Sequence, residues 1–389
     1  MEYKGELMSK KILVWETLAT VSGGQKMTLT VLDMLSDQHE FCCLIPSEGM
    51  LSEELKKRNI PYVLMGDQTL PTGVKGKQVI FRYGWMSVKN IIKSLNIIRK
   101  YKPDMLYCPG PAALPWSAIC GSLTGKQVIW HLHHIFLDGA TKKLLNICSK
   151  FKSVKKIIAV SNCVGEQIVD EKAHNKVEVL YNPVDVEKYA NGDASRVAED
   201  IYKALNIDVL NKEDTLVLGH VALIQRTKKQ GFVLNVIKAL RDKGYNAVGV
   251  FAGECREADY MQELETQVNE LELDGQVAFL GRRNDVPDLL KTFDVLMIPS
   301  AFEGFPLAGL EAAAAGVPVA ACDIAGAKEF ITVSGDGLCF GEDDVDSAVH
   351  AVSICVDNKK IFINKGAAFV SSNTYTKYKT KVSNFLKIL

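Results

Sequence analysis

Two glutamates eight positions apart, Glu303 and Glu311, lie in the stretch PSAFEGFPLAGLEAAAAGVPVAA (residues 299–321). Glycine, proline and alanine surround them, and no other charged residue lies between Ala301 and Ala321. The apolar run before Glu303 is typical of a strand, and the residues after it are typical of a helix. Carboxylates accept hydrogen bonds from vicinal hydroxyl groups, so the pattern predicts sugar binding, with Glu311 on a ribose. Helix capping is the alternative.

The same stretch predicts an anion site. Gly304 allows the chain to approach a ligand closely, and Pro306 pre-sets the turn into the helix. The first N–H groups of that helix, near Leu307, Ala308 and Gly309, have no partner within the helix and lie at the positive end of its dipole. Phosphate is a natural ligand for such amides.

A cationic loop lies earlier in the same half of the chain. The segment HVALIQRTKKQG (220–231) follows the end of a predicted strand and carries Arg226, Lys228 and Lys229. These cations suit a diphosphate. An exposed basic loop without a ligand is the alternative, and the nearby helix start favours the diphosphate.

The first half of the chain holds weaker signals. Gly23 and Gly24 join the first predicted strand to its helix and would let backbone amides approach a ligand, although ordinary tight turns use the same pair. The GxGxxG spacing is missing, which disfavours a dinucleotide cofactor. In WHLHH, His131 and His133 share one face of a predicted strand and His134 follows. No nearby acid or cysteine completes a zinc site, so we predict hydrogen bonding or proton handling.

Two other features have simpler interpretations. The aspartates of DDVD (343–346) look like a metal motif, but they follow a glycine and start a helix, so N-capping explains them. The ten cysteines are scattered without a CxxC motif, which predicts reduced thiols and no structural zinc.

Length and charge narrow the class of protein. A chain of 389 residues predicts two domains. Its net charge is zero, which argues against nucleic-acid binding. Residues 1–190 hold 25 Lys/Arg and 18 Asp/Glu, or +7, and the rest of the chain is −7. The N-terminus is too polar for a signal peptide and no apolar run could span a bilayer, so we expect a cytoplasmic protein.

Short β-branched runs alternate with helical patterns in both halves, typical of parallel sheets buried on both faces. The alternation loosens at 183–214, where we predict turns and a domain junction. We therefore expect an α/β protein with two doubly wound domains, 1–190 and 191–370, and a C-terminal helix at 371–389 that packs back on the first domain. The domains should face each other across a cleft, with ligands at the carboxyl ends of the strands.

Peripheral contact with an anionic membrane is a further possibility. In a helix predicted at 86–100, Val88, Ile91, Ile92, Leu95 and Ile98 repeat at helical spacing while the lysines and arginines face elsewhere. A surface helix packed on the core is favoured over one that touches lipid headgroups. Segment 137–156 carries six lysines with apolar residues between them, which suits anionic lipid or ordinary surface packing.

Taken together, these stretches resemble the retaining glycosyltransferases of family 4, whose GT-B fold has two Rossmann-like domains. EGFPLAGLE resembles the E-x7-E motif of that family. GGQKMTLTVL, IIAVSNCV and VLYNPVDVEKY are similar to its N-terminal half, and VAFLGRRNDVPDLLKTFDVLMIPSAFEGFPLAGLEAAAAGVPVAACDIAG is similar throughout. The resemblance covers nearly the whole chain and is more specific in the second half.

The resemblance implies roles for single residues. Glu303 contacts the donor sugar, Glu311 holds the ribose hydroxyls, and the backbone of Phe305, Pro306, Leu307 and Ala308 receives the phosphates. Lys228 neutralises the leaving diphosphate. The histidine near the donor sugar is His133, with His131 as second choice, and the nucleobase pocket begins at Gly281 and Arg282.

One position departs from the family. An arginine is expected five residues before Lys228, and the sequence has Leu223 there. Arg226 is the nearest residue that could replace it; otherwise catalysis would be weak or the chain would only bind its ligand.

The resemblance implies transfer of a hexose from a UDP- or GDP-linked sugar to a glycan or lipid-linked acceptor. It implies retention of configuration, no metal or other cofactor, and a place in bacterial surface polysaccharide synthesis at the inner face of the cell membrane. A sugar-nucleotide epimerase, a silent nucleotide-sugar binder and a glycan-binding scaffold are the alternatives.

Overall fold

The computed structural model describes residues 9–68, 77–205 and 214–387. The chain divides into two compact units: unit 1 is Met1–Asn182 with Thr376–Leu389, and unit 2 is Pro183–Tyr375. The first division falls eight residues before the boundary placed at 190 from the sequence. The C-terminal segment belongs to unit 1.

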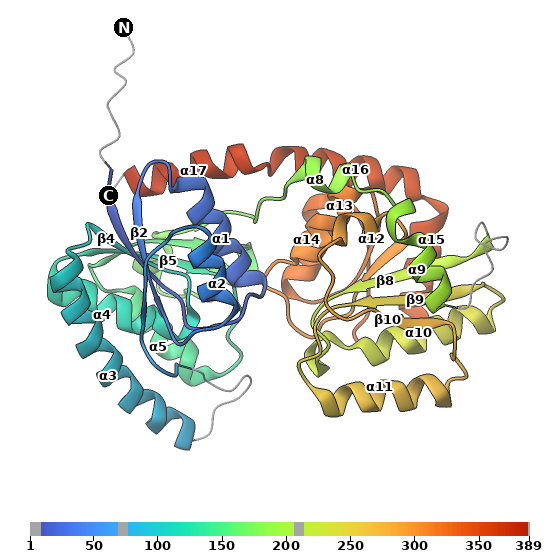
Figure 1. The fold of residues 1–389 in the computed structure, drawn as a ribbon, viewed down its shortest axis with the longest axis horizontal. Helices are drawn as coiled ribbons and strands as arrows, with labels where there is room; N and C mark the ends of the chain where they lie inside the picture. The colour runs from blue at the N-terminus through green and yellow to red at the C-terminus, as the bar shows by residue number, and fades with distance from the viewer. Residues whose placement is uncertain (1–8, 69–76, 206–213, 388–389) are drawn as a thin grey trace, which may run out of the picture. The chain divides into compact units, whose positions relative to one another are not determined.

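Unit 1 is built on a sheet of seven parallel strands in the order β3-β2-β1-β4-β5-β6-β7 (Figure 1). The strands are β1 Lys11–Trp15, β2 Glu40–Ile45, β3 Tyr62–Leu64, β4 Met105–Cys108, β5 Gln127–Leu132, β6 Val154–Ala159 and β7 Val177–Val179. The chain starts at β1, adds strands on one side and then continues on the other. This is a doubly wound order, with its switch point between β1 and β4.

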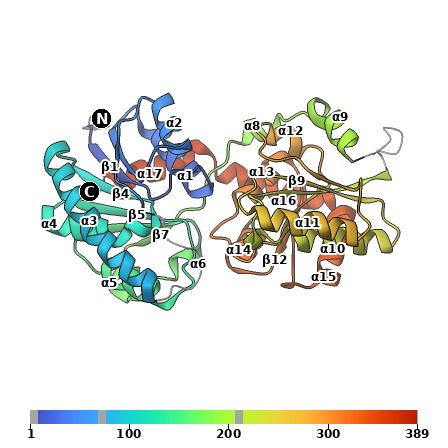
Figure 2. The same cartoon turned by 60° about the horizontal axis from the view of Figure 1, so that its bottom comes forward.

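Helices cover both faces of this sheet (Figure 2). Helices α1 and α2 pack together on one face, and α17 joins α1 over the same strands. Helices α3, α4 and α5 pack side by side on the other face. The helices of unit 1 are α1 Gly23–Leu35, α2 Met50–Lys57, α3 Lys77–Tyr101, the short 3-10 turn η1 Pro111–Ala113, α4 Leu114–Thr124, α5 Gly139–Ser149, α6 Asn162–Gly165, α7 Glu171–His174 and α17 Tyr375–Lys387.

Unit 2 has a six-stranded parallel sheet in the order β10-β9-β8-β11-β12-β13. Its strands are β8 Leu216–Val221, β9 Ala247–Ala252, β10 Val277–Phe279, β11 Val295–Ile298, β12 Val319–Cys322 and β13 Gly337–Phe340. The winding again starts in the middle, so the switch point lies between β8 and β11. The expected fold class of two Rossmann-like α/β domains is confirmed.

The helices of unit 2 form two packed groups. Helices α10, α11 and α15 bury one apolar cluster against the sheet, and α13, α14 and α16 pack with one another. The helices are α8 Val186–Ala190, α9 Ser195–Ala204, the 3-10 turn η3 Arg226–Lys228, α10 Gln230–Asp242, α11 Ala258–Glu270, α12 Val286–Leu290, α13 Leu307–Ala315, α14 Ala325–Ser334, α15 Val345–Asp357 and α16 Lys359–Ser372. Helices α8 and α9 lie where the sequence predicted only turns.

The structure corrects the predicted core face of α3. Val88 and Ile92, expected to pack inward, are more than half exposed. Ile98 is buried as expected, and the other buried positions are Met86, Asn90 and Ser94. On this face Asn90 Oδ1 accepts a hydrogen bond from Gln68 Nε2 at 3.3 Å, whereas Ser94 Oγ is buried without a partner.

Three smaller expectations can be compared with the structure. All ten cysteines are free thiols, as predicted. Asp344 is the N-cap of α15 and accepts a hydrogen bond from Ser347 N, which confirms the capping interpretation of DDVD. Within the described ranges, none of the helices combines the length and apolarity needed to cross a bilayer.

A buried carboxyl in unit 2 makes stability depend on pH. Asp336 is fully buried, neither of its side-chain oxygens has a partner, and burial raises its pKa to about 9. The folded state therefore holds a proton that the unfolded state releases above about pH 4. The resulting cost to folding is absent below that pH and grows as pH rises toward 9.

Asp336→Asn keeps the shape and removes the titration. We predict that wild-type stability falls by on the order of a few kcal/mol between pH 5 and pH 8 and that the variant removes most of this fall. Urea unfolding at several pH values measures both. Identical pH profiles for the two proteins would contradict the assignment of a protonated Asp336.

Candidate active site

The central feature of unit 2 is an ion pair at the sheet's switch point. Lys228 ends the turn η3 that follows β8, and Glu303 lies in the loop after β11. Lys228 Nζ lies 2.6 Å from Glu303 Oε1, with the side chains 22% and 16% exposed. The two loops are also joined through the backbone, where Ala301 N donates to Thr227 O at 2.9 Å. The strand order thus brings together two residues that are 75 positions apart.

The three neighbouring cations of this loop point to different partners. Lys229 adopts a left-handed conformation at φ 51° and its ammonium pairs with Glu342 and Asp343. Only Lys228 of the three contacts Glu303. The backbone turn at Lys229 therefore separates side chains that the sequence places in one basic cluster.

Arg226 lies in an acidic environment formed mainly by α11. Its guanidinium pairs with Asp259 at 2.9 Å and with Glu263, and its carbon lies 5.1 Å from the centre of the Tyr260 ring. The structure thus does not bring Arg226 to the Lys228–Glu303 pair. Its expected role on the diphosphate stays a prediction, and the described contacts give this side chain a structural use.

Close packing fixes the turn after Glu303. Gly326 N donates to Glu303 O at 3.1 Å, and a Cβ atom at Gly326 would lie 2.1 Å from Gly304 O. Phe305 is buried, with its ring 5.7 Å from Phe330 and 6.5 Å from Phe369. The backbone of this turn therefore has little freedom to move.

Helix α13 begins directly after this turn. Pro306 is its N-cap residue and Leu307 and Ala308 its first two positions, and no side chain caps the helix. A nine-residue helix with an uncapped start directs backbone donors and a positive dipole end at the space before it. The structure thus places the predicted phosphate-binding backbone immediately beside Glu303.

Glu311 lies one turn into the same helix. The hydroxyl of Tyr189, on α8, forms a hydrogen bond with its carboxylate. Burial, and then the charge of Glu311, raise the pKa of Tyr189, so the tyrosine stays neutral. Tyr189 could not be identified from the sequence, because α8 lies in a segment whose composition predicted only turns.

His220 is a second residue of this region for which the sequence predicted no role. It lies on β8, is buried, and its Nδ1 bonds Met297 O at 2.9 Å, which leaves Nε2 without a partner. Burial lowers its pKa to about 4, with a further lowering by Lys228 and an opposite effect of Glu303. A neutral histidine therefore stands close to the ion pair.

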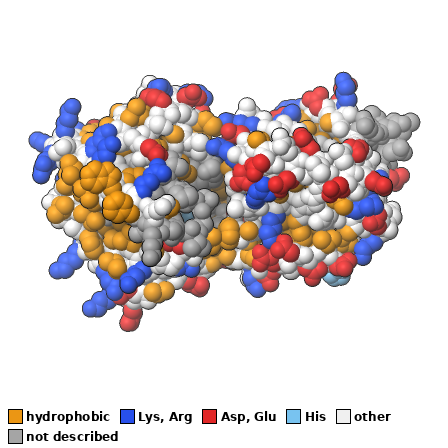
Figure 3. All heavy atoms as spheres, turned by 90° about the horizontal axis from the view of Figure 1, so that it is seen from below, with side chains coloured by type: hydrophobic (Ala, Val, Ile, Leu, Met, Phe, Trp, Pro, Cys, Tyr) orange, Lys and Arg blue, Asp and Glu red, His pale blue; other side chains and the backbone are white. Residues whose placement is uncertain are grey.

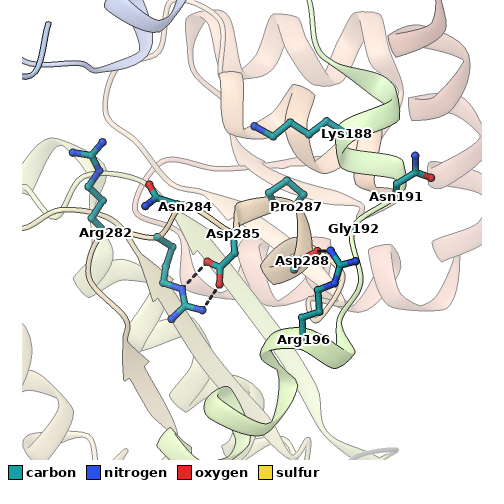
Figure 4. A pocket seen from close by; sticks show the side chains of 10 residues that line it. Lys188, Asn191, Gly192, Arg196, Arg282, Asn284, Asp285, Pro287 and Asp288 are labelled. Atoms are coloured by element: carbon teal, nitrogen blue, oxygen red, sulfur yellow. Dashed lines mark hydrogen bonds and ion pairs between the residues drawn. The ribbon is translucent and has the colours of Figure 1, made fainter. Parts of the chain in front are cut away.

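Gly281 and Arg282 lie at the end of β10. Gly281 has a φ of +62° and its carbonyl accepts a hydrogen bond from Gly253 N at 2.8 Å, which ties the ends of β9 and β10 together. Arg282 lines an open hollow of about 680 Å³ between this loop and α8–α9 (Figure 4). The hollow is lined by Lys188, Asn191, Gly192, Arg196, Arg282, Arg283, Asn284, Asp285, Pro287 and Asp288. Glu303 and Lys228 are not part of its lining.

The predicted residues of unit 1 form a group of their own. The rings of His131 and His133 lie 4.0 Å apart, as their alternation predicted. Gly23 and Gly24 are the first residues of α1, and a Cβ atom on Gly24 would lie 3.5 Å from His134 Nε2 and 3.9 Å from His133 Cβ, so the start of this helix lies beside these histidines. The structure describes this group and the Lys228–Glu303 pair within separate units.

The two neighbouring histidines, His131 and His133, differ in their surroundings. His131 is fully buried, with Nδ1 2.5 Å from the hydroxyl of Tyr107 and Nε2 3.5 Å from that of Tyr378, so it links the sheet to α17. The Nε2 atom of His133 has no partner. Burial is the main cause that lowers the pKa of both, which keeps them neutral. His133 therefore keeps a buried ring nitrogen without a hydrogen-bond partner.

Glu16 follows β1 as Glu303 follows β11. It is buried and accepts hydrogen bonds from Gln25 Nε2 at 3.0 Å and from Thr28 Oγ1, and burial raises its pKa. It thereby fixes the first turns of α1 behind Gly24. An acid directly after the apolar run KILVW was the signal that could have identified it. Among the residues that the structure describes, no cluster of three or more His, Cys, Asp or Glu could hold a metal ion.

Two family models match the chain. The model described as glycosyl transferases group 1 matches residues 203–369, and the model described as glycosyltransferase family 4 matches residues 21–188. Between them they include Lys228, Glu303 and Glu311 of unit 2 and the histidines of unit 1.

Relatives and solved structures agree with these matches. An Escherichia coli protein named UDP-Gal:alpha-D-GlcNAc-diphosphoundecaprenol alpha-1,3-galactosyltransferase is 25% identical over 91% of this chain and 89% of its own. A Campylobacter jejuni N,N'-diacetylbacillosaminyl-diphospho-undecaprenol alpha-1,3-N-acetylgalactosaminyltransferase is 33% identical over 23% of this chain and 24% of its own. The crystal structure of Anabaena HepE in complex with UDP and glucose has a TM-score of 0.78 at 20% identity and covers 98% of this chain and 100% of its own. At 20% identity, the likeness to HepE shows similarity of fold alone.

The contact between Gly326 and Gly304 can be tested by adding one methyl group. We predict that Gly326→Ala displaces the turn after Glu303 and lowers stability by about 1 to 3 kcal/mol, because the new Cβ atom would meet backbone rather than a flexible side chain. Gly139→Ala is the matched control, since nothing lies within 4 Å of its Cβ position at the start of α5. Thermal unfolding compares them, and equal melting temperatures would show that the turn is not tightly packed.

Proposed function

Because the chain belongs to the group 1 glycosyltransferases with the GT-B fold, we propose that it transfers a hexose from a UDP- or GDP-linked sugar to a glycan or lipid-linked glycan acceptor, with retention of configuration. The observation that supports this most is the Lys228–Glu303 pair beside the uncapped start of α13. A cation and a helix start that adjoin one carboxylate suit a diphosphate joined to a sugar.

Charge stabilisation is the main chemical task in this proposal. When the bond between the anomeric carbon and the diphosphate breaks, negative charge develops on the leaving phosphate. An ammonium has three N–H donors, and Lys228 uses one on Glu303 in this structure, so others can reach a phosphate oxygen. The amides at the start of α13 supply further donors. The proposal assigns no metal or other cofactor to this role.

The acids and the histidine then act as positioning groups. Glu303 holds Lys228 and accepts hydrogen bonds from hydroxyls of the donor sugar, while Glu311 does the same for the ribose. His133, neutral and with a free Nε2, hydrogen-bonds the sugar from unit 1. The acceptor hydroxyl attacks on the face from which the diphosphate leaves, which gives retention.

The names of the relatives support a narrower choice. The Escherichia coli protein is named for a UDP-linked donor and a diphosphoundecaprenol-linked acceptor, and the Campylobacter jejuni protein for a diphospho-undecaprenol acceptor. We therefore favour UDP over GDP and a lipid-linked glycan over a free one. The setting is bacterial surface polysaccharide synthesis at the inner face of the cell membrane.

Substitutions at the ion pair test the chemistry. We predict that Lys228→Ala and Glu303→Ala each lower kcat by roughly three powers of ten while the melting temperature changes little, since charge stabilisation of this kind contributes about 3 to 4 kcal/mol. Turnover of the donor with a lipid-linked acceptor measures the effect. Near-normal turnover in either variant would reject the assignment.

Arg226→Ala is the matched control, because Arg226 is a cation in the same loop as Lys228. Its guanidinium binds the acids of α11, so we predict a change in turnover of less than about tenfold, together with a small loss of stability. A loss as large as that of Lys228→Ala would instead show that Arg226 replaces the family arginine that is missing at Leu223.

The contact between Tyr189 and Glu311 predicts an effect on donor binding. Tyr189→Phe removes one hydrogen bond from the carboxylate assigned to the ribose, so KM for the donor should rise by roughly fivefold with kcat nearly unchanged. Tyr245→Phe, at an exposed tyrosine, is the control. A lower kcat with an unchanged KM would place Tyr189 in another role.

A panel of nucleotides and nucleotide sugars separates this function from its alternatives. The proposed transferase shows a raised melting temperature with the correct nucleotide and consumes the donor only when acceptor is present. An epimerase converts the donor without acceptor, a silent binder is stabilised without turnover, and a glycan-binding scaffold does not respond to nucleotides.

A further inference from the structure

The outward side of α3 carries large apolar side chains that have no role in the core. Phe81 is 81% exposed, Trp85 74%, Val88 54% and Ile92 57%. These positions are spaced by four, three and four residues, so they form one stripe along the helix. Figure 3 shows hydrophobic side chains gathered on this part of unit 1. We call this stripe the α3 outer face.

The opposite side of the same helix anchors it to the unit. The ring of Tyr83 stacks on that of Trp116 at 5.6 Å, and its hydroxyl donates to Ala112 O at 3.0 Å. Trp116 Nε1 donates to Ser87 Oγ at 2.6 Å. Because packing is satisfied on that side, the α3 outer face is not required for folding. Four exposed large apolar residues in one stripe need another explanation.

Basic side chains run beside the stripe. At 100° per residue, Arg82, Lys89, Lys93 and Lys100 fall along the adjoining edge of the helix. From Asp67 to Leu137 the sequence holds nine lysines and arginines and two acids, Asp67 and Asp104, and Asp67 pairs with Arg82 at 2.7 Å. A stripe of aromatic and branched residues with a basic border and few acids is the pattern of a helix that lies in the headgroup region of a bilayer.

We propose that the α3 outer face docks unit 1 on a membrane surface that contains anionic lipid. Phe81, Trp85, Val88 and Ile92 enter the interface, and the bordering lysines contact the headgroups. The inference rests on exposure and charge alone and holds whether or not the proposed transfer reaction is correct.

Charge decides between a lipid surface and a second copy of this chain. Arg82 already pairs with Asp67 at 2.7 Å, but Lys89 and Lys100 appear in none of the ion pairs among the described residues, so self-association through this face would bring unpaired cations of two copies together. Anionic headgroups neutralise the same side chains. The charge of the patch therefore selects lipid.

The lysine-rich segment 137–156 gives weaker support for membrane docking than the α3 outer face does. Lys150 pairs with Asp170 at 2.7 Å and Lys156 pairs with Glu178 at 2.5 Å. Two of its six lysines thus have internal acidic partners. Lys89 and Lys100 appear in none of the ion pairs among the described residues, which makes them better probes of headgroup contact.

Tryptophan fluorescence provides a direct readout of docking. The chain has four tryptophans, and Trp15, Trp116 and Trp130 are buried, so Trp85 dominates the solvent-sensitive emission. Vesicles of phosphatidylcholine with phosphatidylglycerol should shift the emission to the blue and protect it from acrylamide quenching. Vesicles of phosphatidylcholine alone should do so weakly. Trp85→Phe should still sediment with the mixed vesicles but lose the spectral response.

Substitutions separate the apolar contribution to vesicle binding from the electrostatic one. The double variant Phe81→Ser/Trp85→Ser should weaken sedimentation with mixed vesicles by at least about tenfold. The double variant Lys89→Glu/Lys100→Glu should weaken it by roughly tenfold, and this second effect should shrink as the salt concentration rises. The controls are Ile361→Ser, an exposed apolar residue on α16, and Lys203→Glu, an exposed lysine on α9, and both should bind as the wild type does. Circular dichroism and thermal unfolding verify that each variant is folded.

Three results would overturn the proposal. The first is a folded Phe81→Ser/Trp85→Ser variant that sediments as the wild type does. The second is an unchanged Trp85 emission on vesicles that do bind the protein. The third is a wild-type dimer, measured by light scattering, that becomes a monomer in the same double variant, because this face would then be covered by a second copy.

Discussion

The ion pair between Lys228 and Glu303 is the interaction on which the candidate site depends. Its partners come from loops after β8 and β11, the strands between which the winding of the sheet reverses. At such a point the two adjoining connections leave in opposite directions and open a space at the carboxyl ends of the strands. A lysine and a glutamate that pair there hold an ammonium group in place, and under the proposed function this preorganisation would stabilise the charge that develops on the leaving phosphate.

The surroundings of the pair make it rigid. Phe305 is buried between two aromatic rings, Gly326 admits the backbone of Gly304 at close range, and Tyr189 holds Glu311. Each of these contacts joins segments that are distant in sequence. Apolar packing and a glycine contact thus fix the backbone around the ion pair.

The sequence predicted the parts of the site that lie on one continuous segment. The strand, turn and helix from residue 295 to 315 could be predicted because apolar runs, Gly304 and Pro306 mark them locally. The alternation of elements likewise predicted two doubly wound α/β domains. Tyr189 was missed because its contact with Glu311 spans more than a hundred residues and has no local pattern.

Other differences between the prediction and the structure arose where a local sequence pattern permits two arrangements. Arg226, Lys228 and Lys229 are adjacent, but a left-handed residue and acids on α11 send them to separate partners. On α3 there are two apolar stripes, and sequence periodicity alone does not say which one the core takes. On the inward side, Ser87 Oγ accepts a hydrogen bond from Trp116 Nε1 and Asn90 Oδ1 accepts one from Gln68 Nε2.

A crystal structure of the protein with UDP bound tests the central claim most directly. The account predicts the diphosphate within hydrogen-bond distance of Lys228 Nζ and of the amides of Leu307 and Ala308, with the ribose hydroxyls on Glu311. UDP bound elsewhere in unit 2, for example in the hollow between Lys188 and Asp288 with no phosphate near Lys228, would contradict it.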